Sequence, residues 1–253
     1  MNVEIAAPLL VGLLLASVRA AAWLLIAPPF ASRAVPGAVK AILAVALSLP
    51  VAPRLAETVP ELTAAGLITS AVLQAFTGAA LGFITYLLFQ AVQSAGDLID
   101  LFGGFSVAMG YDPLSMTQNS VFGRFTSQLA VVLLFALNGH LLVIRGFLES
   151  YDAVPLSASI DVERLSEVLV TSIGEFLLAA LQIAAPLIGV LFVVDVGLGL
   201  LTRIAPALNP FMLGFPAKIL ATLLLFGACV PLIPGAVDRV VDMGLRAVAA
   251  AVG

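Results

Sequence analysis

Long apolar runs, separated by short polar or proline-containing breaks, are the main pattern along this chain. A hydrocarbon core of about 30 Å needs about 20 consecutive apolar residues in helical form, and several runs approach or exceed that length. The longest, 62–96, holds no charged residue in 35 positions. As one helix it would be about 52 Å long, so we expect it either to project from the bilayer or to break. The pattern predicts an all-α integral membrane protein with long, kinked or broken hydrophobic helices.

Shorter apolar runs predict the other hydrophobic helices, which makes five or six in a single membrane domain over 1–253. Prolines end several of these runs, because proline cannot continue a helix without losing a backbone hydrogen bond. Pro186 predicts a kink within one of them. The remaining expected helices cover 5–30, 39–49, 125–144, 176–194 and 219–237.

The segments between the runs are more polar, and we expect most of them to lie outside the helices. The interval 195–218 holds so many glycines and prolines that we expect no straight helix there. We expect 97–124 to form a long ordered loop and 145–167 a polar connection, with the next helix beginning near Asp161. The residues 238–253 predict a weakly amphipathic tail.

Composition supports the membrane interpretation and removes several functional classes. Of the residues, 62% are hydrophobic and 10% are charged, against about 25% charged in an ordinary soluble domain. This composition makes membrane lipid an expected partner. The net charge of −4 and the absence of a Lys/Arg cluster make nucleic acid an unexpected one. The single cysteine, Cys229, and the single histidine, His140, exclude an internal disulfide and a Cys/His zinc site. We therefore expect no metal and no cofactor.

The first apolar run lacks the positively charged start of a secretory signal, since Glu4 precedes the earliest cation, Arg19. We therefore expect this run to remain in the mature protein. Cations fall in nearly every connection, so the positive-inside rule favours neither orientation in the membrane.

Four ionisable residues lie inside or beside apolar runs: Arg19, Lys40, Asp195 and Lys218. A charge at mid-membrane costs at least about 2.5 to 3.5 kcal/mol on insertion scales, so such residues are expected to face protein or water. We assign them, together with Arg203, to subunit contacts. The alternative is that their charged ends reach a nearby membrane surface while the stems stay in lipid.

Gly78 and Gly82 form a pair of small residues, four apart, on the longest predicted helix. Such a pair lets another helix backbone approach closely, and we assign it to subunit contacts as well. The four-residue spacing drifts around the helix by about 40° at each step, so it suits a crossing partner better than a parallel one. The alternative is that these are ordinary small residues of a membrane helix. The same spacing continues through Ser70, Gln74, Tyr86 and Gln90.

The segment 103–119 mixes glycines with large apolar side chains inside the expected loop. Large apolar side chains are unfavourable when they are fully exposed to water, so we do not expect this segment to lie free in solvent. A segment that closes a channel and withdraws from it needs a flexible backbone and soft, space-filling side chains, so we interpret this one as a candidate plug. The alternative is a connection packed permanently within the protein. The candidate plug residues are Gly103, Gly104, Phe105, Met109, Gly110 and Met116.

Catalysis receives little support from the residues. Ser106 follows two glycines, and His140 lies on the next predicted helix, but the glycine that should follow a serine nucleophile is absent. Asp97, Asp100 and Asp112 could act as acid and base, yet no substrate pocket or metal partner accompanies them. We therefore do not expect an enzyme.

Ordered motifs along nearly the whole chain resemble the FliR family, the R/T-type export-gate subunits of flagellar and virulence type III secretion. The opening third contributes Arg19, Pro28, Pro36 and Lys40 ahead of an apolar run. The centre contributes Gly82-Phe83, Gly96, Asp100, Gly103, Asp112-Pro113 and Asn138-Gly139-His140. The last third agrees best, with Ala184-Ala185-Pro186, Asp195, Gly199, Arg203, Pro206, Asn209, Gly214, Pro216 and Lys218 in family-like order.

This resemblance implies a subunit that joins the related P and Q subunits, and the B-type switch subunit, in a helical ring complex. Unfolded flagellar proteins would cross the bacterial cytoplasmic (inner) membrane through that ring at the flagellar basal body. Much of the apolar surface would then be buried against other subunits. By the same analogy, the segment 103–119 would be the plug of the gate. We choose the flagellar branch over the virulence branch because it is the more abundant.

Two other functions remain as alternatives at the level of the sequence. A small secondary transporter would bind a cation at Asp195 or Asp97 beside a broken helix near the midplane. A structural scaffold without a pore would tolerate deletion of the plug segment with no change in permeability.

Overall fold

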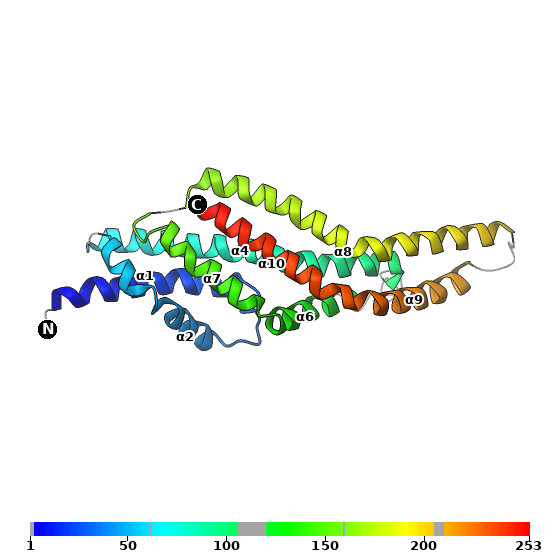
Figure 1. The fold of residues 1–253 in the computed structure, drawn as a ribbon, viewed down its shortest axis with the longest axis horizontal. Helices are drawn as coiled ribbons and strands as arrows, with labels where there is room; N and C mark the ends of the chain where they lie inside the picture. The colour runs from blue at the N-terminus through cyan, green and yellow to red at the C-terminus, as the bar shows by residue number, and fades with distance from the viewer. Residues whose placement is uncertain (1–2, 61, 106–119, 159, 205–209) are drawn as a thin grey trace. The chain divides into compact units, whose positions relative to one another are not determined.

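The computed structural model of the chain describes residues 3–60, 62–105, 120–158, 160–204 and 210–253 (Figure 1), and among these residues it has helices and no strand. Two short 3₁₀ turns, η1 (Ala56–Thr58) and η2 (Val230–Leu232), adjoin longer helices. The α-helices are α1 (Val3–Ile26), α2 (Gly37–Ser48), α3 (Ala52–Leu55), α4 (Ala64–Gly103), α6 (Val121–Ala136), α7 (Gly139–Ala153), α8 (Val162–Ile204), α9 (Pro210–Cys229) and α10 (Ile233–Val252).

The described residues contain four helical stretches that are long and apolar enough to cross a membrane, by length and composition. The number rises to six if two bent pairs, α2 with α3–η1 and α6 with α7, each count as one span. The all-α membrane fold expected from the apolar runs is therefore confirmed. The four stretches are Ala7–Ile26, Ala64–Gly103, Val162–Leu201 and Gly214–Val252.

The longest apolar run forms one continuous helix, α4, as its lack of proline allowed. The helix does not stop at Gly96 but continues to Gly103, so the expectation of a loop from residue 97 was wrong at that end. Asp97 and Asp100 lie about one turn apart on α4, and both carboxylates meet the start of α6. Their charges thus belong to a helix–helix contact and not to a solvated loop. The loop expectation was also wrong from residue 121, where α6 begins.

The proline- and glycine-rich interval 195–218 holds the end of one helix and the start of another, so no single straight helix crosses its described residues, as expected. Helix α8 passes Gly197 and Gly199 and ends at Ile204, and Pro186 lies inside it. Helix α9 begins with Pro210, a first-turn position where the missing N–H costs nothing, and it continues past Pro216. Residues 205–209 lie outside the described residues.

The run 125–144 and the connection 145–167 are also divided differently from the expectation. The chain breaks at Asn138, whose φ of 59° is left-handed, a conformation that asparagine tolerates better than most residues. Helix α7 then continues through Arg145 to Ala153. It does so because its apolar side chains, including Phe147 and Tyr151, are buried on one face. The expectation of a helix starting near Asp161 is confirmed by α8 at Val162.

The C-terminal residues, expected as a weakly amphipathic tail, belong to an amphipathic helix, α10. Val237, Val241 and Val248 are buried at intervals of about one or two turns, while Asp238 and Arg246 are exposed. This spacing of three to four residues is the period of a helix that packs on one side. The preceding apolar run 219–237 is interrupted at η2, beside Pro231 and Pro234, as expected from the prolines.

The chain divides into two compact units, which are described separately below. Unit 1 comprises Met1–Leu88, Asn138–Gly174 and Val241–Gly253. Unit 2 comprises Phe89–Leu137 and Glu175–Val240. The single-domain expectation stays a prediction.

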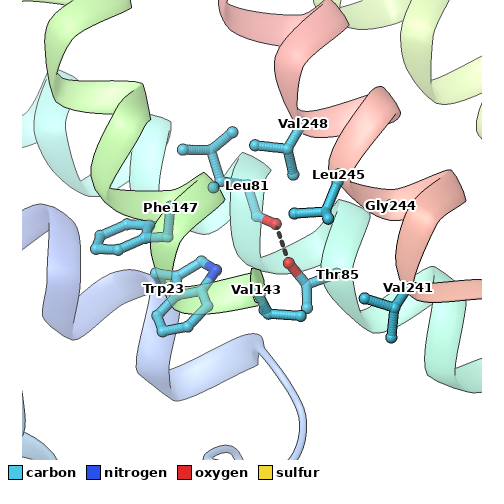
Figure 2. Close-up of a pocket in the computed structure, with 10 residues that line it drawn as sticks. Trp23, Leu81, Thr85, Val143, Phe147, Val241, Gly244, Leu245 and Val248 are labelled. Carbon is cyan, nitrogen blue, oxygen red and sulfur yellow. Dashed lines mark hydrogen bonds between the residues drawn. The ribbon is translucent and has the colours of Figure 1, made fainter. Parts of the chain in front are cut away.

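The core of unit 1 lies where α1, α7 and the first part of α4 meet the end of α10. Figure 2 shows this contact, with Trp23 of α1 beside Phe147 of α7, and Leu245 and Val248 of α10 facing them. The rings of Trp23 and Phe147 stack with centroids 4.5 Å apart. A void of about 10 Å³ remains between these side chains, so the packing is nearly complete.

Candidate functional site

Arg19 of α1 is completely buried in unit 1, where its guanidinium group contacts α4 and α7. Its Nε donates a hydrogen bond of 2.6 Å to the side-chain oxygen of Gln74. Nη1 donates to the carbonyl oxygen of Ser150 at 3.0 Å, and Nη2 donates to that of Val154 at 2.6 Å. The guanidinium carbon also lies 4.4 Å from the centre of the Tyr151 ring, which is the geometry of a cation–π contact.

Among the described residues, no carboxylate pairs with Arg19. Besides Gln74, its acceptors are two carbonyl groups at the C-terminal end of α7, where the helix dipole is negative. The Ser150 carbonyl also accepts from the Val154 N–H at 3.0 Å. Neighbouring side chains complete the network: the Tyr151 hydroxyl donates to the Ala16 carbonyl at 2.7 Å, and Gln74 Nε2 donates to the Leu156 carbonyl at 3.1 Å. The arginine therefore ties α1 and α4 to the end of α7.

Gly78 and Gly82 lie where α4 crosses α1, close to Arg19. A Cβ atom on Gly78 would overlap the carbonyl oxygen of Arg19, which belongs to the backbone and cannot rotate away. A Cβ on Gly82 would lie 3.0 Å from the Cβ of Ile26. The close helix approach that these glycines allow is thus present inside the chain, and its partner is α1.

The residues predicted to contact other subunits differ in their surroundings within the chain. Arg19, Gly78 and Gly82 have the neighbours just described within unit 1. Lys40 is half-buried and Arg203 is exposed. In unit 2, Lys218 of α9 pairs with Asp195 of α8 at 2.8 Å, with side chains 16% and 44% exposed respectively. Contact with other subunits stays a prediction for these residues.

The C-terminal end of α4 packs against α6 and α9 within unit 2. A Cβ on Gly103 would lie 2.9 Å from the hydroxyl oxygen of Thr222, so glycine allows the helices to approach there. Gly104 has a φ of 84°, a left-handed conformation that favours glycine and ends the helix. The Phe105 ring meets the Phe122 ring edge-on at 5.2 Å. Three of the six candidate plug residues are therefore in a packed environment.

The other three candidate plug residues, Met109, Gly110 and Met116, lie outside the described residues. Ser106, which the catalytic alternative would need, lies outside them as well. Within the part of the chain that is described, no three His, Cys, Asp or Glu side chains converge in a way that could hold a metal ion.

Asp100 of α4 caps the N-terminal end of α6. One of its carboxylate oxygens accepts hydrogen bonds from the Ser120 hydroxyl, from the Phe122 N–H at 3.0 Å and from the Gly123 N–H at 3.4 Å. Asp97 lies directly against Gly123, where a larger residue would not fit. Two carboxylates are favourable at this position because the start of a helix carries partial positive charge and unpaired N–H groups. The contact joins the two helices that flank the candidate plug segment.

We predict that Asp100→Ala lowers the free energy of unfolding by about 1 to 3 kcal/mol, because it leaves the Phe122 N–H at the start of α6 without its acceptor and the Gly123 N–H with the Ser120 hydroxyl alone. The melting temperature of the purified protein in detergent would measure this loss. Asp238→Ala is a suitable control, since Asp238 is exposed on α10. An Asp100→Ala protein as stable as wild type would rule out the capping role.

Sequence reasoning named Asp100 only as a possible acid or base and as part of a family-like series. Ser120 gave a usable signal, since a serine directly before an apolar run is a typical helix N-cap. Gln74 and Tyr151 were missed as partners of Arg19. A buried arginine needs acceptors, but no local pattern indicates that they come from residues 55 to 135 positions away.

Several long apolar helices, one buried arginine and a glycine-dependent helix crossing define this chain as an integral membrane protein with several spans. The chain belongs to the family described as bacterial export proteins, family 1, whose model matches residues 10–244.

Curated relatives of known name are similar along most of the chain. A flagellar biosynthetic protein FliR from Pectobacterium carotovorum is 34% identical, with 86% of this chain and 83% of the relative covered. The protein of the same name from Escherichia coli is 35% identical, with coverage of 85% and 82%. Yop proteins translocation protein T from Yersinia pestis is 30% identical over 60% of this chain and 59% of that protein. The family resemblance stated from the motifs is confirmed.

Proposed function

We propose that this chain is a non-enzymatic subunit of the flagellar type III protein export gate, in the bacterial cytoplasmic membrane at the flagellar basal body. The observation that carries the proposal is the similarity to relatives named flagellar biosynthetic protein FliR across more than four-fifths of each chain. The match to the Yersinia translocation protein is shorter and lower in identity, which favours the flagellar branch over the virulence branch.

The partners in this proposal are the related P and Q subunits, the B-type switch subunit, and unfolded flagellar proteins as the exported substrates. The apolar surface of the chain supports association with other proteins as well as lipid. Large side chains such as Leu14, Val170 and Phe192 are more than 60% exposed in the isolated chain. Exposed apolar side chains also lie along the 40-residue helical stretches, which are longer than a bilayer is thick. Part of this apolar surface therefore needs to be covered by protein.

Deleting the gene in the bacterium that carries it tests the function. Hook and filament proteins should disappear from the culture medium while remaining present inside the cells, and a plasmid copy of the gene should restore their export. The intracellular level separates a defect in export from a defect in synthesis. Normal export in the deletion strain would refute the proposal.

The candidate plug is the second part of the proposal, with Phe105, Met109 and Met116 obstructing the channel at rest. It is supported by the way both flanks are held: α4 ends at glycines packed on α9, and Asp100 holds the start of α6. Fixed flanks are what a segment needs if it is to close the same channel reproducibly.

Deletion of residues 106–116 should therefore raise the ion permeability of cells that express the assembled gate, because it removes most of the obstruction. A membrane-potential dye would measure the leak. The same deletion in cells that lack the P and Q subunits should show no leak, since no channel forms there. Unchanged permeability, with the gate shown to be assembled by copurification, would eliminate the plug.

A further inference from the structure

A narrow apolar cavity lies within unit 2, between α4, α6, α8 and the stretch that runs from α9 through η2 into α10. Its volume is about 110 Å³. The hydroxyl of Thr126 lies at the cavity, where it donates a hydrogen bond to the Val92 carbonyl oxygen at 3.1 Å. Apolar cavities of about 150 Å³ exclude water and bind hydrocarbon molecules, so hydrocarbon is the chemistry that suits this one. The buried apolar residues of its wall are Val92, Ile99, Leu187, Phe226, Ile233 and Ala236.

The cavity is elongated along the helices. Val92 and Ile99 both line it and lie about two turns apart on α4, or about 10 Å along the helix. On the other wall, the lining residues extend from Phe226 to Arg239, about 20 Å apart along one long apolar stretch. At one end Phe226 packs on Phe122, with ring centroids 4.6 Å apart. A helix with its side chains is about 10 to 12 Å wide, so an extended hydrocarbon chain fits this shape and a helix does not.

The opening of the cavity has apolar surroundings. Gln182, Pro186 and Leu232 line it and are exposed. All three belong to stretches that are long and apolar enough to cross a membrane. Leu178 and Leu181, on the same helix as Pro186, are more than half exposed. An acyl chain can therefore reach the cavity from the bilayer without crossing water.

Arg239 of α10 places a positive charge at the end of the cavity remote from Phe226. Its side chain is exposed, and it forms no ion pair with any residue that the structure describes. The preceding residue, Asp238, is exposed and does not line the cavity. Basic residues between membrane helices recognise the anionic head groups of lipids. A cation at one end of an apolar cavity thus complements a molecule with an anionic head and a hydrocarbon tail.

We propose that this cavity binds a membrane phospholipid with an anionic head group. One acyl chain lies along the cavity towards Phe226, and the lipid phosphate pairs with Arg239. The proposal is independent of the export function, because it uses residues of this chain alone. It adds a ligand site that contains none of the residues assigned to the plug or to subunit contacts.

The single cysteine of the chain, Cys229, lines the cavity and reports its occupancy. The full-length chain in detergent is mixed with phosphatidylglycerol or phosphatidylcholine of identical acyl chains, and the rate of reaction with N-ethylmaleimide is measured. Half-maximal protection of Cys229 should need about fivefold less phosphatidylglycerol, because that lipid is anionic and phosphatidylcholine is not. Ala228→Cys in a Cys229→Ala chain is the control, since Ala228 is exposed and does not line the cavity. Its rate should not depend on either lipid.

The results that overturn the proposal are distinct. Equal protection of Cys229 by the two lipids would mean that Arg239 recognises no head group. If neither lipid protects Cys229 and only the assembled export gate does, a partner protein fills the cavity and the lipid proposal is overturned.

Substitutions at the two ends of the proposed contact provide an independent measurement. Arg239→Gln should remove the fivefold preference, whereas Arg124→Gln should keep it, because Arg124 is exposed on α6 and does not line the cavity. Ala236→Phe should fill the cavity and abolish the phosphatidylglycerol that native mass spectrometry finds retained on the wild-type chain, and Ala228→Phe should retain it. If Ala236→Phe does not fold, Arg239→Gln decides. An unchanged preference in Arg239→Gln, or unchanged retention in a folded Ala236→Phe chain, would overturn the proposal.

Discussion

Replacing Arg19 by methionine should lower the apparent melting temperature of the purified protein by about 10 °C, the largest effect that we expect from any single substitution. The change removes the Arg19 donor from the Gln74 side-chain oxygen and from the Val154 carbonyl, and it leaves the Ser150 carbonyl with the Val154 N–H alone. Breaking a buried charged network from one side costs on the order of 3 to 5 kcal/mol. That is a large part of the 5 to 15 kcal/mol by which most proteins are stable.

Arg33→Met is the matched control for this experiment, since Arg33 is exposed between α1 and α2. Substitutions at such positions usually change stability by no more than about 0.5 kcal/mol. Thermal unfolding in the same detergent, followed by the loss of soluble monomer, would compare the two variants. A wild-type melting temperature for Arg19→Met would mean that the buried network does not stabilise the fold.

Adding one methyl group at two glycines should have opposite effects, and this is the second large effect that we expect. Gly78→Ala should destabilise the protein by about 1 to 3 kcal/mol or more, because its Cβ meets the backbone of Arg19 and the helices must move apart. Gly174→Ala should stabilise it by about 0.5 to 1 kcal/mol, because Gly174 lies inside α8 with no atom near the new Cβ.

The two alanine variants control each other, since both add the same group to the interior of an apolar helix. Both variants gain the same helix propensity from alanine, so this contribution cancels when they are compared. The difference between their melting temperatures therefore measures the effect of losing the close approach at Gly78. Equal melting temperatures would show that α4 and α1 are not in close contact at this position.

The sequence predicts the helices of this fold better than it predicts their ends. Uninterrupted apolar runs of sufficient length can only be helical in a membrane, which is why α1, α4 and α8 lie where the runs do. The end of α4 could not be predicted, because it depends on Asp97 and Asp100 meeting the start of α6. Nor could the break at Asn138 be predicted, since asparagine occurs in helices and in left-handed turns alike.

The sequence predicted which residues of the candidate site are unusual, but it did not predict which residues they contact. A charge inside an apolar run indicated that Arg19 needs a polar environment, and the glycine pair indicated a close helix crossing. Both partners come from distant parts of the chain, and the acceptors of the arginine include backbone carbonyl oxygens at a helix end. Electrostatic partners of this kind depend on where helix ends fall in space, which local patterns do not encode.

The partners of Arg19 also set an order for the biogenesis of the protein. Gln74 is synthesised 55 residues after the arginine, and the α7 carbonyls follow 131 and 135 residues after it. At typical rates of synthesis, about 5 to 20 residues per second, α1 waits on the order of 10 seconds or more for α7 to emerge. Throughout that interval the Arg19 cation needs water, lipid headgroups or the insertion machinery in place of its final hydrogen-bond acceptors. Helix α1 therefore leaves the ribosome well before the residues that complete its final environment.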